Sequence, residues 1–232
     1  MSLGYTDPDW SELHWAAWEG RESDLALLLA NGADINARDA RGRTAFVVAA
    51  DAVRTIPWLS DQPRPFFSQR HEDAARFLLR HGADIHRRDK GGNTPLMAVV
   101  FGQSQALTRD LLRAGVDVHD RRKDGYNALT CAAGGDNPFI VSLLLEAGAH
   151  VEARDSRGET ALFYAVLCGK REIIPVLLDA GADAAATNNK GKTAADTIRR
   201  SCRLSAGQEL GYPEIVQMLD ALVAQKRNGN IL

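Results

Sequence analysis

Short apolar runs at helical spacing recur along this chain, and turn-forming residues separate them. Leu25, Leu28 and Leu29 lie at the i, i+3, i+4 spacing of one buried stripe, which predicts a helix over 23–30. A comparable apolar run follows Thr160 and ends just before Gly181. The pattern therefore predicts short helices joined by turns that contain glycine.

Glycines recur along the sequence with a constant step. One column has members 33 residues apart, namely Gly82, Gly115, Gly148 and Gly181. A second column has the same period, with Gly92, Gly125, Gly158 and Gly191. Two independent columns with one period indicate an internal structural repeat, in which each unit buries its apolar face against its neighbours.

The residues at the turns and helix starts resemble the ankyrin repeat family over roughly residues 9–224. The best match is Gly92-Asn93-Thr94-Pro95-Leu96, while the histidine of the family signature occurs only as His14. The resemblance implies an all-α solenoid of about six stacked repeats, each a β-turn finger followed by two antiparallel helices. It also implies that the fingers and first helices line a concave binding face.

We expect one ankyrin repeat domain over residues 1–232, with two repeats that depart from the common length. Gly32 and Gly82 are 50 residues apart instead of 33, an excess of 17, which predicts an insertion at 51–71. The last repeat carries a smaller insertion. The expected repeats are 9–39, 40–89, 90–122, 123–155, 156–188 and a capping repeat at 189–224.

Several residues predict where the helices begin and end. Ser11, Thr94 and Asn127 are expected N-caps, whose side chains accept a hydrogen bond from an unpaired backbone N–H. Pro95 is expected at the first helical position, where its missing N–H costs nothing. Gly20 is expected to end the first helix in the left-handed conformation.

Composition narrows the functional classes. Hydrophobic content of 45% and charged content of 25% are typical of a globular protein. The formal net charge of −2 argues against a general nucleic-acid binder, and no apolar run reaches the ~18 residues that a membrane span needs. Three cysteines without C-x-x-C spacing predict neither a disulfide framework nor a zinc site. We therefore expect a cytoplasmic monomer without a secretory signal.

The sequence contains no catalytic motif that we can identify, neither G-x-S-x-G, nor a phosphate loop, nor H-E-x-x-H, so we expect neither an enzyme nor a cofactor. One column does contain residue types that bind metals: Asn36, His86, His119 and Glu152. Equivalent positions in neighbouring repeats are about 10 Å apart. Zinc ligands bond at roughly 2 Å, so we expect no shared ion.

Arginines form a column six residues beyond Gly32, Gly82, Gly115 and Gly148, and Thr187 ends the series after Gly181. Its members are Arg38, Arg88, Arg121 and Arg154. One interpretation is a ladder that faces a partner. The other is structural, with arginines held by the aspartates that follow three of them, as Asp39 follows Arg38. Arg121 is followed instead by Arg122 and Lys123, so this finger is locally basic.

The resemblance implies that the residues just before the turn that ends each first helix lie on the concave side. Aromatic and apolar residues at these positions, with Tyr126 on a finger beside them, predict a docking groove. Trp18, Phe101, Tyr126 and Leu167, together with Arg43 and the arginine column, are the candidate contacts, because Trp, Tyr and Arg are typical anchors of interfaces. Trp18 has an alternative role, which is to cover the exposed end of the first repeat with Trp10 and Trp15.

The insertion supplies a second candidate surface. Trp58, Phe66 and Phe67 lie in it, between prolines that exclude a continuous helix. These aromatic residues either fold back over the helices or project as an arm that contacts a partner, since long loops in compact proteins are commonly functional or disordered.

The resemblance implies a non-enzymatic module that binds a protein partner through its concave face. We expect a regulator or inhibitor, a role that includes the antidote of a bacterial toxin. The alternative is a scaffold that recruits one protein to another. A nucleic-acid role would depend on the arginine column alone, so we expect no nucleic-acid partner.

Overall fold

The computed structural model describes residues 9–51, 69–202 and 212–227 of the chain. Helices and loops make up this part, with one isolated β-bridge between Thr187 and Thr193. The prediction of an all-α repeat architecture is confirmed. The chain divides into two compact units, Met1–Arg122 and Lys123–Leu232, each of which is described by itself. That one domain spans residues 1–232 stays a prediction.

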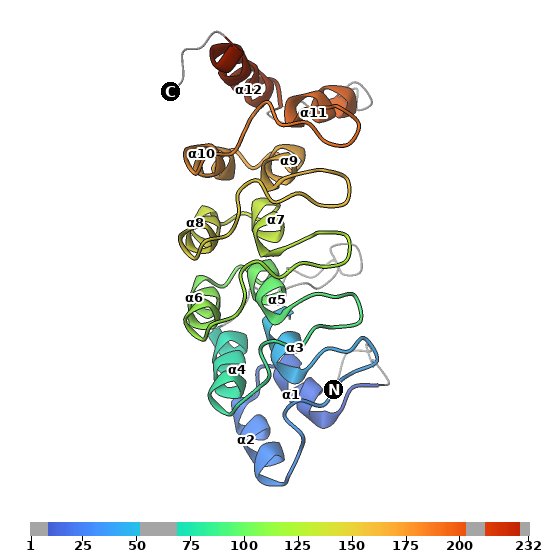
Figure 1. The fold of residues 1–232 in the computed structure, drawn as a ribbon. Helices are drawn as coiled ribbons and strands as arrows, with labels where there is room; N and C mark the ends of the chain where they lie inside the picture. The colour runs from blue at the N-terminus through green and yellow to red at the C-terminus, as the bar shows by residue number, and fades with distance from the viewer. Residues whose placement is uncertain (1–8, 52–68, 203–211, 228–232) are drawn as a thin grey trace. The chain divides into compact units, whose positions relative to one another are not determined.

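In the first unit, consecutive helices pack in pairs, and the pairs stack (Figure 1). The first helices of the pairs contact one another, α1 with α3 and α3 with α5, and the second helices form a neighbouring layer. The helices are α1 (Glu12–Trp18), α2 (Glu22–Ala30), α3 (Ala45–Asp51), α4 (Gln69–Arg80), α5 (Pro95–Phe101) and α6 (Gln105–Arg113).

The second unit repeats this arrangement. Each first helix packs against its own second helix, and α9 contacts both α7 and α11. The helices are α7 (Ala128–Ala133), α8 (Pro138–Glu146), α9 (Ala161–Leu167), α10 (Ile173–Asp179), α11 (Ala194–Cys202) and α12 (Tyr212–Arg227). Among the described residues of both units, no helix is long and apolar enough to cross a bilayer.

Four of the first helices, α3, α5, α7 and α9, are apolar on nearly every side and form the centre of the units. All residues from 45 to 50 in α3 and from 95 to 100 in α5 are buried. The second helices bury one stripe instead, as Leu107 and Leu111 do in α6. Burial of these side chains, at about 25 cal/mol per Å² of apolar surface, is the main stabilising term of the stack.

Two predicted N-caps are confirmed. The hydroxyl of Thr94 accepts the N–H of Met97 at 3.2 Å, with Pro95 at the first helical position of α5. Asn127 and Thr130 form a reciprocal capping box at the start of α7, with both hydrogen bonds at 2.9 Å. These caps satisfy N–H groups that the helix itself leaves unpaired.

The prediction for the side chain of Ser11 was wrong. Ser11 is the N-cap residue of α1, but its hydroxyl accepts no backbone N–H of the helix. It is instead hydrogen-bonded to Nδ1 of His14 at 2.7 Å. The other ring nitrogen of His14, Nε2, lies 3.1 Å from the carbonyl oxygen of Arg43, so this buried histidine links α1 to the next finger.

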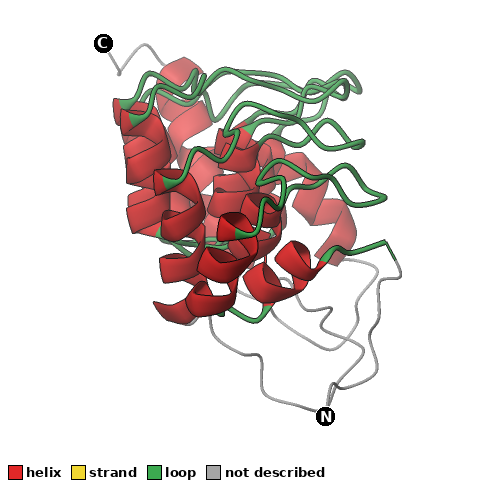
Figure 2. Cartoon of the chain, turned by 90° about the horizontal axis from the view of Figure 1, so that it is seen from below, coloured by secondary structure: helices red, strands yellow, loops and turns green. Residues whose placement is uncertain are grey.

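Each finger is a tight turn closed by main-chain hydrogen bonds. In the finger before α9, Asp155 N–H donates to Glu159 at 3.0 Å and Gly158 N–H donates to Asp155 at 2.9 Å. All members of both glycine columns have φ between 66° and 92°, as does Gly20, which ends the first repeat's leading helix as predicted. Within each unit the fingers project from one side of the helices (Figure 2).

Both ends of the predicted insertion at 51–71 lie in helices. Asp51 is the last residue of α3, and residues 69–71 are the first residues of α4. Trp58, Phe66 and Phe67 lie outside the described residues, so their two predicted roles stay predictions. In the last repeat α12 covers Tyr212–Arg227.

Candidate functional site

The arginine column connects neighbouring repeats through main-chain carbonyls. In the first unit Nη2 of Arg38 donates to the carbonyl of Arg88 at 2.8 Å, and Nη1 of Arg88 donates to that of Arg121 at 2.6 Å. In the second unit Nη1 of Arg154 donates to the carbonyl of Thr187 at 2.6 Å. Each of these three arginines therefore reaches the equivalent position of the next repeat, and each remains exposed to solvent.

The structural alternative for this column named the wrong partner. The aspartates that directly follow these arginines do not pair with them. Their side chains accept hydrogen bonds within their own fingers instead. Oδ1 of Asp39 accepts the N–H groups of Arg41 and Arg43 at 2.9 and 2.8 Å. Oδ1 of Asp155 accepts those of Arg157 and Glu159 in the same way. A carboxylate at this position closes the turn because it can accept several donors at once.

Charge and hydrogen bonds keep these carboxylates ionised. Burial opposes ionisation of Asp39, but the N–H and guanidinium of Arg43 and the N–H of Arg41 outweigh it and lower the pKa of Asp39. Burial opposes ionisation of Asp155 too, and hydrogen bonds from Glu159, Tyr164 and Arg157 lower its pKa. In the third finger of the series Arg122 takes the aspartate position, and its Nη1 lies 3.4 Å from Oδ1 of Asn93.

Tryptophans and Arg43 form a cluster in the first unit. Trp10 packs edge-on against Trp15 at 4.8 Å and Trp18 at 5.6 Å between ring centroids. The guanidinium of Arg43 lies 5.5 Å from the ring of Trp10 and pairs with Asp39 at 2.7 Å. The side chain of Arg43 is only 12% exposed, so this predicted contact residue has internal partners. Trp18 remains half-buried.

A second aromatic cluster lies in the second unit. Tyr126 packs edge-on against Tyr164 at 5.2 Å. The hydroxyl of Tyr164 donates to Asp155 at 2.8 Å and accepts from Nη2 of Arg157 at 2.7 Å. Arg157 also pairs with Glu159 at 2.9 Å, yet its side chain is 59% exposed. The phenol and the guanidinium are thus held in one orientation at the surface.

Burial controls the protonation of both tyrosines. It raises the pKa of Tyr164 to about 12, and the hydrogen bond to Asp155 acts in the same direction. Burial also raises the pKa of Tyr126 above its ordinary range, with further contributions from Cys131, Tyr164 and Cys168. Both phenols are neutral and able to donate at physiological pH.

Three predicted contact residues share one structural position. Trp18, Phe101 and Leu167 are the last residues of α1, α5 and α9, and each is half-buried. Cys168, directly after Leu167, is exposed, whereas Cys131 is buried in α7. The first helices therefore end in apolar side chains that are only partly covered, as the groove prediction requires, and their role in binding stays a prediction.

Members of the column with metal-binding residue types have another role. Oδ1 of Asn36 accepts the N–H of Asp84 at 2.8 Å, and Oε1 of Glu152 accepts that of Asp183 at 2.9 Å. Both bonds reach the next repeat, so these side chains connect neighbouring turns. In the described part of the chain no group of three or more His, Cys, Asp or Glu residues is placed to hold a metal ion.

The sequence interpretation identified Lys123 but missed Tyr164, Arg157 and the cations at the other finger tips. Aligning the fingers on the second-column glycine would have revealed the cations, since each finger has Lys or Arg within two residues before it. These residues are Arg41, Lys90, Lys123, Arg157 and Lys190. The pairing of Tyr164 with Arg157 has no such sequence signal, because it depends on how the finger folds over α9.

Comparison with known families agrees with the repeat geometry. Models described as ankyrin repeats match residues 97–188, in three copies, and residues 66–105, and a single ankyrin repeat model matches residues 9–40. The chain belongs to the ankyrin repeat family. No curated protein matches it. Ankyrin repeats are general modules for protein–protein interaction and are typically non-enzymatic.

Proposed function

We propose that this chain is a single, non-enzymatic ankyrin repeat domain that binds a protein partner through its fingers and the ends of its first helices. The proposed contacts are Trp18, Arg38, Arg43, Arg88, Phe101, Arg121, Arg122, Tyr126, Arg154 and Leu167, to which Arg157 and Tyr164 are added. Its role is that of a regulator or inhibitor that covers a working surface of its partner. The antidote of a bacterial toxin is one such role.

The arrangement of Arg157 and Tyr164 carries this proposal. The guanidinium lies 5.6 Å from the ring of Tyr164 and donates to its hydroxyl, while Asp155 accepts a hydrogen bond from each of the two side chains. Tyr and Arg are the residues in which interface energy is most often concentrated. Side chains that are already ordered lose little conformational entropy on binding, so a rigid pair favours affinity.

A standard interface covers about 800 Å² on each partner, and a few anchor residues commonly supply most of the affinity. Main-chain hydrogen bonds between neighbouring fingers of one unit, such as Asn189 N–H to the carbonyl of Arg157 at 2.9 Å, hold those fingers in one arrangement. A preformed surface of this kind is suited to covering a partner without a conformational change.

Photo-crosslinking from two positions tests the docking surface. A crosslinking amino acid at Leu167 lies at the end of α9, beside the proposed contacts. The matched control is the same amino acid at Phe139, which is 67% exposed on the second-helix layer in α8. In extract of the source cells we expect a crosslinked protein from position 167 and none from position 139. Equal products from both positions would show that the layer of first helices is not the binding face.

Substitution then tests the anchor itself. With the crosslinked partner purified, Arg157→Ala combined with Tyr164→Ala should weaken binding at least about tenfold. A titration of the double variant against the wild-type chain measures this ratio. The regulatory role predicts in addition that a saturating amount of the chain lowers the partner's own activity; an unchanged activity would favour the scaffold alternative.

A further inference from the structure

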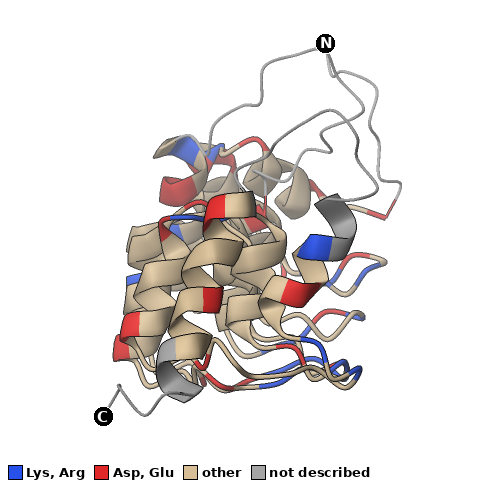
Figure 3. Cartoon of the chain, turned by 90° about the horizontal axis from the view of Figure 1, so that it is seen from above, with Lys and Arg blue, Asp and Glu red and all other residues tan. Residues whose placement is uncertain are grey.

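Each finger presents a cation at its tip. Arg41 and Lys90 occupy the tips in the first unit, and Lys123, Arg157 and Lys190 occupy those in the second. All five residues are exposed. Figure 3 shows Lys and Arg gathered along the finger loops of each unit.

The acidic residues of most fingers are turned inward. The side chain of Asp39 is 1% exposed and that of Asp155 is 4% exposed, because each accepts N–H groups of its own turn. In the last finger neutral Asn188 takes the same position and accepts the N–H of Lys190 at 3.0 Å. The exception is Asp124, an exposed carboxylate next to Lys123. The charge exposed at the outer edge of the fingers is therefore more positive than the sum of the charges in the finger sequences.

The tips within each unit are neighbours, so their charges act together. In the first unit Lys90 N–H donates to the carbonyl of Arg41 at 2.8 Å. In the second, Ser156 and Asn189 make equivalent bonds to the preceding fingers, at 2.7 and 2.9 Å. Neighbouring repeats are about 10 Å apart, which is comparable with the Debye length of about 8 Å at physiological salt. Adjacent cations therefore reinforce one potential.

Most of this charge is not neutralised within the described residues. There, no ion pair joins the side chains of Arg41, Lys90, Lys123 or Lys190 to a carboxylate, whereas Arg157 is paired with Asp155 and Glu159. The chain as a whole has a formal net charge of −2. The positive charge at the finger tips thus arises from where the cations lie and not from an excess of them in the chain. Such an arrangement favours an electrostatic contact at the tips.

We propose that the finger tips of each unit dock an acidic surface of a protein partner. This inference rests on the proposed function and adds the charge of the partner's surface to it. A protein is favoured over a nucleic acid because the chain has no basic excess.

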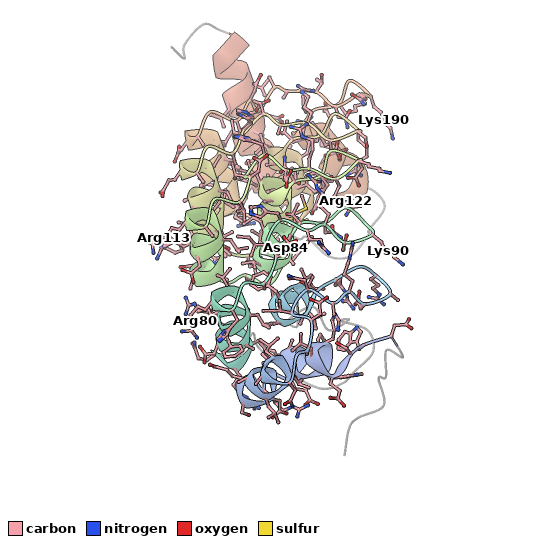
Figure 4. The ribbon with its side chains drawn as sticks, turned by 60° about the horizontal axis from the view of Figure 1, so that its bottom comes forward. Arg80, Asp84, Lys90, Arg113, Arg122 and Lys190 are labelled. Atoms are coloured by element: carbon pink, nitrogen blue, oxygen red, sulfur yellow. The ribbon has the colours of Figure 1, made fainter. Side chains whose placement is uncertain are left out.

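Charge-reversal variants matched for net charge test the proposal. Arg41→Glu with Lys90→Glu removes the basic edge of the first unit, and Lys123→Glu with Lys190→Glu removes that of the second. Arg80→Glu with Arg113→Glu is the control, because both arginines are exposed on α4 and α6, away from the finger that carries Lys90 (Figure 4). Arg157 is left unchanged because it also holds Tyr164.

The probes are a fluorescent peptide rich in Glu and Asp, and a single-stranded oligonucleotide of similar length and charge. Fluorescence anisotropy at about 0.01 M and about 0.15 M salt follows their binding. We expect the acidic peptide to bind the wild-type chain at low salt and about tenfold more weakly to each finger variant. The control variant should bind like the wild type, and the higher salt should weaken binding in all cases.

Three results would overturn the proposal: no binding of the acidic peptide, an equal loss in the control variant, or tighter binding of the oligonucleotide than of the peptide. If circular dichroism shows that a finger variant is unfolded, the corresponding Gln substitutions replace it. Crosslinking from Leu167 separates the two proposals. A crosslinked product from position 167 without binding of the acidic peptide would support the docking surface and contradict the acidic partner. Binding of the peptide without a crosslinked product would contradict the docking surface.

Discussion

Nη1 of Arg88 donates to the carbonyl oxygen of Arg121 across 2.6 Å, and Nη2 of the same side chain pairs with Asp120. One arginine thus spans to the next repeat and binds two groups there. The fork of guanidinium N–H donors makes this possible, since two acceptors can be reached at fixed angles. The bond connects Arg88 to Arg121, which occupy equivalent positions in two consecutive repeats, so it shows that these repeats are in register.

We predict that Arg88→Ala lowers the free energy of unfolding by about 1–2 kcal/mol, because a charge-assisted hydrogen bond between repeats is lost. Urea denaturation followed by circular dichroism measures the change. Arg87→Ala is the control, since its guanidinium pairs with Asp84 of its own repeat. That variant should change stability by less than about 0.5 kcal/mol. Equal losses in the two variants would show that the inter-repeat bond has no special weight.

Gly158 and Gly191 are equivalent finger glycines with different surroundings. A Cβ at Gly158 would collide with Asn189 of the next finger, with the main-chain nitrogen at 2.9 Å, whereas a Cβ at Gly191 meets nothing within 4 Å. Both have positive φ, so alanine is strained at either position. We predict losses of about 3 kcal/mol for Gly158→Ala and about 1 kcal/mol for Gly191→Ala. Thermal unfolding ranks the two variants, and similar losses would argue against the close finger contact.

Acid should destabilise the chain through Asp39. Its pKa is lowered in the folded protein from the ordinary 3.8, so the ionised form stabilises the fold at higher pH. That contribution is lost as the pH falls below about 4 and through the lowered folded value. Asp39→Asn should cost about 3 kcal/mol at neutral pH, since it removes the carboxylate that pairs with Arg43 at 2.7 Å and leaves only the more distant ion pair with Asp51, at 4.0 Å. Its stability should then fall less steeply between about pH 5 and 2.

The other aspartates with lowered pKa, Asp84, Asp155 and Asp196, retain part of the acid dependence in that variant. Asp24→Asn is a suitable control because Asp24 pairs with Arg21 at the surface. It should keep both the stability and the slope of the wild-type chain. An unchanged slope in Asp39→Asn would mean that Asp39 is not a main contributor to acid unfolding.

Alkaline conditions should act through Tyr164. Its folded pKa of about 12 lies above the ordinary 10.0, so the neutral phenol stabilises the fold below pH 10. This contribution declines as the pH rises from about 10 and is lost by the folded value. A spectroscopic titration of phenolate absorbance should show this late step, and Tyr164→Phe should remove it. A phenol that titrates near 10 would contradict the buried hydrogen bond to Asp155.

Much of the repeat structure is predictable because it is local. The caps Thr94 and Asn127 bind N–H groups three residues away, so their role follows from neighbours along the chain. Ser11 shows the limit of this reasoning. Its hydroxyl could bond either to the helix N–H groups or to His14. It is hydrogen-bonded to His14, which also contacts the next finger. Propensity names candidates for a cap, whereas packing selects among them.

The candidate surface was predictable in outline but not in its partners. Trp18, Phe101 and Leu167 share a helix-end position that the period together with the family resemblance identified. The arginine column was also visible, yet its expected ion pairs with the following aspartates were wrong. In the structure those aspartates accept N–H groups of their own turns, and the arginines reach carbonyls one repeat away.

The sequence by itself determined the architecture, because a constant period of glycines, caps and apolar runs repeats the same local energetics in every unit. Tertiary structure alone decided which groups are available to a partner. Asp39 and Asp155 are drawn inward because a buried turn needs acceptors for its N–H groups. Lys90 and Lys190 remain at the tips, where a charged amine keeps its water. A list of charges contains no such distinction, since it arises only when the fingers fold.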